Sequence, residues 1–270
     1  MQKRVSRSYF HINNNLLKSK RSQVTILIIL AVVVIVGILI FSFLNKESSS
    51  LNLENAFSKI GATSQATIIE SQILECIKSI SEDANVVIGI QGGYYNAPPK
   101  FEDIGLAFIP YYYDQSTLQP SKEKIESELA LYLDENIDFC LNQINNNELS
   151  LSYKTSDSSA KINQDSISFT TDLSITISKE ELTETIKLEN HPIEINSPLN
   201  DAFEIATFIT QTHKEDPENI CISCITQMAS DRDMFVDFLE SEEEATTLVV
   251  ISKSYENQDP YIFQFLNKYQ

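Results

Sequence analysis

The chain has 270 residues, with 20 Lys and Arg against 38 Asp and Glu, a formal charge of −18, and no tryptophan. Residues 1–46 hold seven of the basic residues and no acidic residue, so residues 47–270 carry a formal charge of −25. Because binding to phosphates depends on Lys and Arg side chains, so acidic a segment repels nucleic acid and anionic lipid head groups. Composition therefore argues against a nucleic-acid partner.

One long apolar segment spans residues 24–44, interrupted only by Thr25, Gly37 and Ser42 and without any charge. Its length matches the roughly 20 residues that a helix needs to cross a hydrocarbon core. The basic residues of the chain's amino end, the last of which is Arg21, lie directly upstream of this apolar segment. The positive-inside rule therefore places the amino end in the cytoplasm. A cleaved signal peptide has a shorter apolar core and a small-residue cleavage site, which is missing here. We therefore expect a basic cytoplasmic tail (1–23), a transmembrane helix (24–44), a linker (45–63) and an extracytoplasmic domain (64–270).

The first half of the outer domain has the apolar spacing of helices. Apolar residues at steps of three and four predict an amphipathic helix over residues 64–88. Residues 91–99 contain two glycines and two prolines, which predict an ordered loop. Residues 105–113 are expected to form a strand that is interrupted at its proline. A second amphipathic helix is predicted over residues 121–144, with Ser121 as its N-cap.

The second half begins with a period of two. Apolar and polar residues alternate over residues 149–153 and 167–177, which is typical of antiparallel strands with one buried face. Helices are then predicted over residues 199–212 and 217–230, followed by three strands (234–239, 246–253 and 261–266). Helices followed by strands, rather than strict alternation, indicate a single α+β domain in which amphipathic helices pack on an antiparallel sheet.

All four cysteines, Cys76, Cys140, Cys221 and Cys224, follow the apolar segment. An even number of cysteines outside the cytoplasm favours disulfides. Cys76 and Cys140 lie on the apolar stripes of the two predicted long helices, where a bridge would join these helices. The alternative is a pair of buried free thiols, which behave as small hydrophobes.

Cys221-Ile222-Ser223-Cys224 is the motif with the most definite chemistry. A Cys-x-x-Cys near a helix start is how thiol oxidoreductases lower a thiol pKa, while the other interpretation is a structural disulfide. A four-cysteine zinc site would need Cys76 and Cys140 as well, and an oxidising exterior favours disulfides instead. The acidic run around Glu240 is expected to be a solvated hairpin tip rather than a calcium site. We expect no metal and no cofactor.

Five tyrosines, Tyr94, Tyr95, Tyr111, Tyr112 and Tyr113, are interleaved with Pro98, Pro99 and Pro110. Tyrosine is enriched at interfaces, so these residues are the candidate binding surface. The alternative is that the rings cover the helices from within the fold. The sequence contains no Gly-x-Ser-x-Gly, no His-Glu-x-x-His and no P-loop, so we assign no catalytic residue and do not expect an enzyme.

Residues 20–26, Lys-Arg-Ser-Gln-Val-Thr-Ile, resemble the amino termini of membrane-anchored surface proteins from small-genome archaea. The stretches Gln91–Tyr95, Ile109–Tyr113, Pro120-Ser121 with Glu126, Glu128 and Leu129, and Cys221–Cys224 resemble an uncharacterised family of such proteins. This resemblance implies a membrane anchor and transfers no function. The same amino terminus resembles class III signal segments, which are cut before a glutamine (here Gln23) and lead into pilin-like subunits. In this chain a serine precedes that glutamine where glycine is usual, and the glutamate typical of pilins is absent.

The sequence thus predicts a single-pass protein of the cell membrane whose acidic, disulfide-stapled outer domain serves protein binding or cell-surface architecture. Its expected partner is another protein or a second copy of the chain. Two alternatives are a membrane-tethered thiol-disulfide oxidoreductase that uses Cys221 and Cys224, and a pilin-like filament subunit.

Overall fold

The computed structural model describes residues 62–144, 150–179, 182–216, 220–241, 245–256 and 258–268. These residues belong to the second of two units into which the chain divides, Phe57–Gln270. The predicted tail (1–23) and transmembrane helix (24–44) lie outside the described residues, as does the predicted linker apart from its last two positions. Among the helices that are described, none is both long and apolar enough to cross a membrane.

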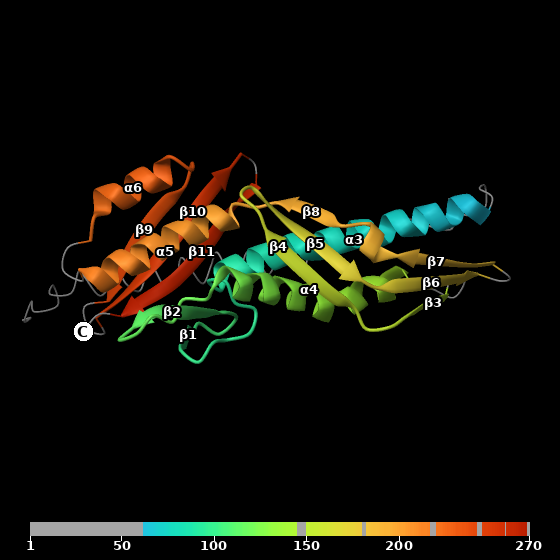
Figure 1. The fold of residues 1–270 in the computed structure, drawn as a ribbon, viewed down its shortest axis with the longest axis horizontal. Helices are drawn as coiled ribbons and strands as arrows, with labels where there is room; N and C mark the ends of the chain where they lie inside the picture. The colour runs from blue at the N-terminus through green and yellow to red at the C-terminus, as the bar shows by residue number, and fades with distance from the viewer. Residues whose placement is uncertain are drawn as a thin grey trace, which may run out of the picture. The chain divides into compact units, whose positions relative to one another are not determined.

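The domain is a mixed α+β fold, which confirms the predicted class. Its described residues form four α-helices and three β-sheets (Figure 1). The helices are α3 (Ala62–Ile90), α4 (Lys122–Ile144), α5 (Leu199–Glu215) and α6 (Ile222–Ser230). The helix predicted over residues 64–88 is therefore present as α3, the one predicted over 121–144 as α4, and the one predicted over 199–212 as α5.

The largest sheet has the strand order β1-β2-β11-β10-β9. Its strands are β1 (Phe101–Asp103), β2 (Phe108–Asp114), β9 (Phe235–Ser241), β10 (Thr246–Tyr255) and β11 (Gln258–Lys268). The last three strands pair antiparallel, as predicted, but β11 and β2 are parallel, so the expectation of a purely antiparallel sheet is wrong at this pair. α5 packs against β10 and β11, α6 packs against β9, and α3 contacts β11.

Two antiparallel three-stranded sheets complete the domain. One consists of β3 (Ser150–Tyr153), β6 (Ser174–Lys179) and β7 (Leu182–Lys187), and the other of β4 (Asp157–Ile162), β5 (Ser166–Asp172) and β8 (Ile193–Asn196). The alternation over residues 167–177 is continuous in sequence, yet the chain changes sheets at Leu173. Because Leu173 is buried as the alternation requires, the pattern does not reveal the change.

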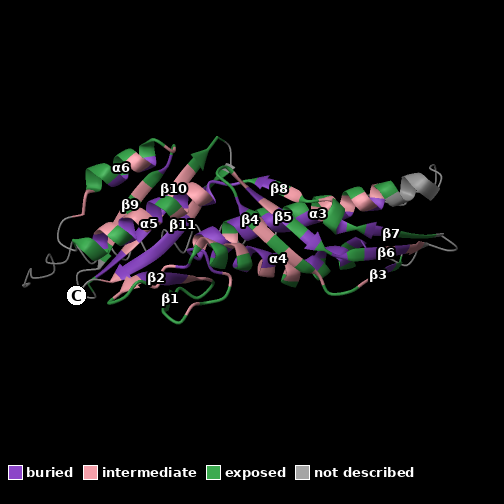
Figure 2. Cartoon of the chain, in the orientation of Figure 1, coloured by how far each residue is buried: buried purple, intermediate pink, exposed green. Residues whose placement is uncertain are grey.

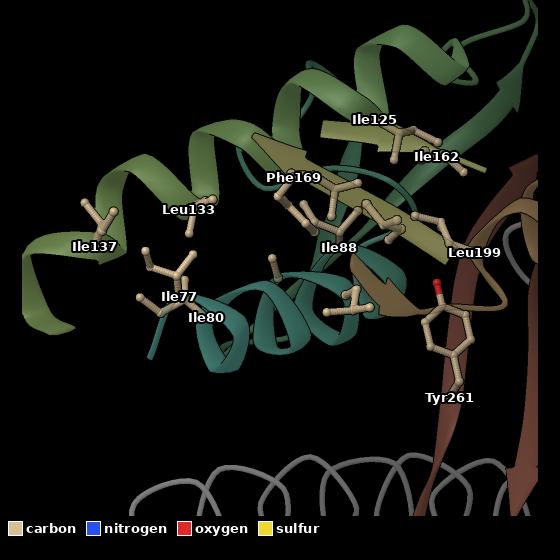
Figure 3. Packing of buried hydrophobic residues seen from close by; sticks show 14 of the residues in the cluster. Ile77, Ile80, Ile88, Ile125, Leu133, Ile137, Ile162, Phe169, Leu199 and Tyr261 are labelled. Carbon is tan, nitrogen blue, oxygen red and sulfur yellow. The ribbon is translucent and has the colours of Figure 1, made fainter. Parts of the chain in front are cut away.

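The helices and the sheets share one large hydrophobic core, and a second, small cluster of Ile109, Tyr111 and Leu266 is separate from it. Ile73 and Ile77 of α3 and Leu129 and Leu133 of α4 are buried on the predicted stripes, and Figure 3 shows Ile77 and Ile80 pointing toward α4. Burying such a side chain stabilises the fold by about 1.5–3 kcal/mol. The same cluster continues to residues of β5, β10 and β11.

Two predicted boundaries differ from the structure. The helix predicted over residues 217–230 begins at Ile222, with Cys221 as its N-cap, and residues 217–219 are outside the described part. The strand predicted to break at Pro110 runs through it as β2. The proline is tolerated because no strand pairing needs its missing N–H. The Tyr111 amide donates toward β1, to the Lys100 carbonyl at 3.2 Å, so position 110 faces away from β1, and pairing with β11 begins one residue later, at Tyr111.

α4 also covers the free edge of β4, a strand that the sequence does not predict because it is mostly polar. Glu126 Oε1 accepts a hydrogen bond from the Ile162 amide at 2.9 Å. Asp134 Oδ2 accepts one from the Ser158 amide at 3.1 Å. These two carboxylates satisfy backbone donors that an edge strand would otherwise present to another chain.

Candidate functional site

The four cysteines form two disulfides. The first joins Cys76 of α3 to Cys140 of α4 across 64 positions, with 6.0 Å between the two Cα atoms. Cys140 is fully buried within the core, and Cys76 packs against it. In the chain-entropy model, closing a loop of this length stabilises the fold by about 4 kcal/mol. The predicted bridge between the two long helices is therefore present.

The second disulfide joins Cys221 to Cys224, with 5.2 Å between the two Cα atoms. Cys221 is the N-cap of α6, and its Sγ accepts a hydrogen bond from the Cys224 amide at 3.3 Å. Cys224 is exposed and Cys221 is partly exposed. The two cysteines are only 3 positions apart in sequence. For so short a loop the chain-entropy model gives a stabilisation of the fold of about 2 kcal/mol.

The candidate tyrosine surface is not assembled by the fold. Tyr94, Tyr111 and Tyr112 are buried, and only Tyr95 and Tyr113 keep part of their surface exposed. Both faces of β2 are covered near these positions, so alternation along the strand buries Tyr111 on one side and Tyr112 on the other. The expectation of one binding surface made of all five tyrosines is therefore wrong.

Tyr112 instead belongs to the core. Its ring stacks on Phe265 of β11 with centroids 4.3 Å apart, and its hydroxyl donates to the Gly92 carbonyl at 3.0 Å. Complete burial raises the pKa of the Tyr112 hydroxyl well above its ordinary value of 10.0. Tyr112 therefore stays neutral and ties β2 to the turn that follows α3.

That turn requires its two glycines. Gly92 and Gly93 have φ values of +54° and +86°, which L-residues with a side chain rarely adopt. A Cβ atom on Gly92 would lie 2.5 Å from the Gln264 carbonyl oxygen of β11. The turn thus brings the backbone at the end of α3 into close contact with the largest sheet. The predicted ordered loop therefore begins with a turn that packs closely on β11.

Glu128 holds the residues after the turn in place. Its Oε2 atom accepts hydrogen bonds from the amides of Tyr95 at 2.8 Å and Asn96 at 2.9 Å. The carboxylate is buried, and Lys124 one helical turn earlier forms an ion pair with its other oxygen. Sequence reasoning missed this role, because an (i, i+4) Lys–Glu pair on a helix is normally a surface feature.

The two histidines of the outer domain lie on different elements. His191 follows the short 3-10 helix η1 (Leu188–Asn190), and its Nε2 lies 3.1 Å from Glu70 Oε1. His213 lies on α5 and is buried, and this burial lowers its pKa to about 4.

Within the described residues no group of three or more His, Cys, Asp or Glu side chains is placed to hold a metal ion. Glu240 lies on β9, and Glu242–Glu244 are outside the described part.

His213 makes the stability of the fold depend on pH. Its folded-state pKa of about 4 is below the ordinary value of 6.5, so the unfolded chain takes up this proton first as the pH falls. The stability due to neutral His213 is therefore present above pH 6.5 and is lost toward pH 4. Between pH 7 and pH 5, urea unfolding should show a loss of about 2 kcal/mol that a His213→Gln variant lacks. The variant His191→Gln is the matched control and should keep the full loss. An equal pH response in wild type and His213→Gln would contradict this prediction.

Three exposed apolar residues lie close together on the hairpin between β1 and β2, which the sequence did not indicate. Leu106 is 71% exposed, and Phe101 and Ile104 are also exposed. Gly105 has φ +91°, and its amide donates to Asp103 Oδ1 at 2.7 Å, which fixes the tip. All three residues of the edge strand β1 are exposed as well. An ordered hairpin that presents apolar side chains beside a free strand edge is the type of surface that protein partners use.

Comparison of the chain with protein-family models, with curated proteins and with solved structures gives no match.

Proposed function

We propose that this chain is a single-pass membrane-anchored protein that displays an acidic, disulfide-stapled α+β domain outside the cytoplasm. There the domain serves protein binding or cell-surface architecture. The apolar segment 24–44 acts as the anchor, and the basic residues before it keep the amino end in the cytoplasm.

The observation that carries this proposal is the pairing of all four cysteines. Structural disulfides form and persist in oxidising compartments and are rare where thiols are kept reduced. A bridge between two long helices, with Cys140 fully buried in the hydrophobic core, is a structural disulfide in this sense. Every cysteine follows the apolar segment, on the side that the charge distribution assigns to the exterior.

The binding role is supported by the hairpin of β1 and β2. Its apolar tip residues Ile104 and Leu106 project from a tip that the Asp103–Gly105 hydrogen bond orders. A Cβ atom on Gly105 would meet nothing within 4 Å and Leu106 is 71% exposed, so the tip is open to solvent at these two positions. We assign this hairpin as the surface that contacts a partner protein.

A photo-reactive residue tests this surface in the full-length protein within native membranes. p-Benzoylphenylalanine in place of Leu106 should give a discrete crosslinked adduct, whereas the same photo-reactive residue in place of Phe139, which is equally exposed at 71%, should not. Combining the probe at position 106 with the substitution Ile104→Glu should remove the adduct. This substitution should change the unfolding free energy by less than about 0.5 kcal/mol, because it lies on the surface. Equal adducts at both positions, or none at position 106, would contradict the assignment.

A further inference from the structure

The Cys221–Cys224 disulfide differs from the Cys76–Cys140 disulfide in its surroundings. Cys140 is fully buried between two helices, whereas Cys224 lies exposed at the start of α6. The two intervening residues, Ile222 and Ser223, are exposed as well. Figure 2 shows that much of α6 is exposed, and its buried contacts come from Ile225 and Ala229 further along the helix. The second disulfide is therefore open to a thiol that approaches from solvent.

The sulfur of Cys221 lies among hydrogen-bond donors. It accepts the Cys224 amide at 3.3 Å, and the Ser223 hydroxyl lies 3.6 Å away. As the N-cap side chain, it also sits at the positive end of the dipole of α6, whose first turn contains no acidic residue. Each of these features stabilises a negative charge on this sulfur. A thiolate formed at Cys221 is thus better stabilised than one formed at Cys224, whose sulfur accepts no hydrogen bond among the described contacts.

We propose that Cys221–Cys224 is a redox-active disulfide that exchanges with a dithiol of a partner protein. A thiolate of the partner attacks Sγ of the exposed Cys224. The Cys221–Cys224 bond breaks, a mixed disulfide forms between Cys224 and the partner, and Cys221 leaves as the stabilised thiolate. The second thiol of the partner loses its proton and attacks the partner's own sulfur in the mixed disulfide. Cys224 then leaves and takes up a proton.

This exchange balances. Two electrons pass from the partner's dithiol to the Cys221–Cys224 disulfide, so the partner gains a disulfide and the site becomes a dithiol. The reverse exchange uses the same atoms, with the Cys221–Cys224 dithiol as reductant and a partner disulfide as oxidant. The activity adds to the proposed anchoring role and does not depend on it, because it needs only the start of α6.

The full-length protein is tested with a synthetic peptide that carries two reduced cysteines. Rapid alkylation and mass spectrometry then follow both disulfides of the protein and the oxidation of the peptide. We expect one peptide disulfide per chain, with Cys221–Cys224 reduced at least about tenfold faster than Cys76–Cys140. The variant with both Cys221→Ser and Cys224→Ser should lose the exchange while its far-ultraviolet circular dichroism stays unchanged. Equal reduction of the two disulfides, or peptide oxidation by the double variant, would overturn the proposal.

A second measurement separates an active site from a disulfide that is merely accessible. After selective reduction, iodoacetamide should alkylate Cys221 at least about fivefold faster than Cys224 at neutral pH, because the stabilised thiolate is the reacting species. Ser223→Ala removes the nearby hydroxyl and should lower this ratio without affecting the fold. Faster alkylation of Cys224, or a ratio near one in the wild type, would contradict the role given to Cys221.

Discussion

Removing the disulfide between the long helices, by Cys76→Ala together with Cys140→Ala, should lower the unfolding free energy by about 4 kcal/mol. The bridge spans 64 positions, so its loss frees a long loop in the unfolded chain. A loss of this size is a large fraction of the roughly 5–15 kcal/mol by which native domains are stable. Urea unfolding under non-reducing conditions measures it.

The matched control comes from the same chain. Removing the other disulfide, by Cys221→Ala together with Cys224→Ala, should cost about 2 kcal/mol or less, because the loop that it closes is short. If the two double variants lost the same stability, the bridge between α3 and α4 would not be the staple of the fold.

Replacing Gly92 with alanine should destabilise the domain by about 3 kcal/mol or more. The residue has φ +54°, and the added Cβ would lie 2.5 Å from the Gln264 carbonyl oxygen and 2.7 Å from Pro110 Cγ. The turn would have to move away from β11, and the hydrogen bond from Tyr112 to the Gly92 carbonyl would be disturbed. Thermal or urea unfolding of the variant measures this loss.

Gly105→Ala separates the two causes of this effect. Gly105 also has a positive φ, of +91°, but its Cβ would meet no atom within 4 Å. We expect about 1–2 kcal/mol from backbone strain alone at this position. A loss at Gly92 no larger than the loss at Gly105 would show that close packing against β11 is not the cause.

The helices of this domain could be predicted because their sequence carries a local signal. The apolar stripes of α3 and α4 recur at helical spacing, and Ser121 caps α4 as expected, with the Lys124 amide 3.2 Å from its Oγ. The position of Cys76 and Cys140 on these stripes was sufficient to suggest their pairing. In each case the residues that decide the structure lie on the element itself.

What the sequence did not reveal depends on contacts between distant segments. The change of sheet at Leu173 leaves the alternation of side chains intact, so only strand pairing defines it. The parallel pairing of β2 with β11 joins segments about 150 residues apart, which no local pattern encodes. The same pairing buries Tyr111 and Tyr112, which is why an aromatic cluster in the sequence is not an exposed surface in the fold.

The candidate sites show the same difference between local sequence signals and contacts that only the fold creates. The Cys-x-x-Cys motif was visible in the sequence, but its exposure and the N-cap position of Cys221 required the structure. The roles of Glu128 and of the hairpin around Leu106 were not visible at all. The buried carboxylate of Glu128, which binds two amides, has ordinary neighbours in sequence, and so does the apolar Leu106 at the hairpin tip. Only the tertiary fold gives these residues their roles.

If residues 24–44 anchor the chain as we propose, the disulfide-bonded domain lies in an oxidising compartment. Non-reducing peptide mass spectrometry on the native protein, after membranes are washed at alkaline pH and free thiols are alkylated, examines the anchor and the disulfides together. We predict that the protein stays with the washed membranes and yields peptides linked through Cys76–Cys140. Recovery in the soluble fraction, with Cys76 and Cys140 both alkylated as free thiols, would contradict it.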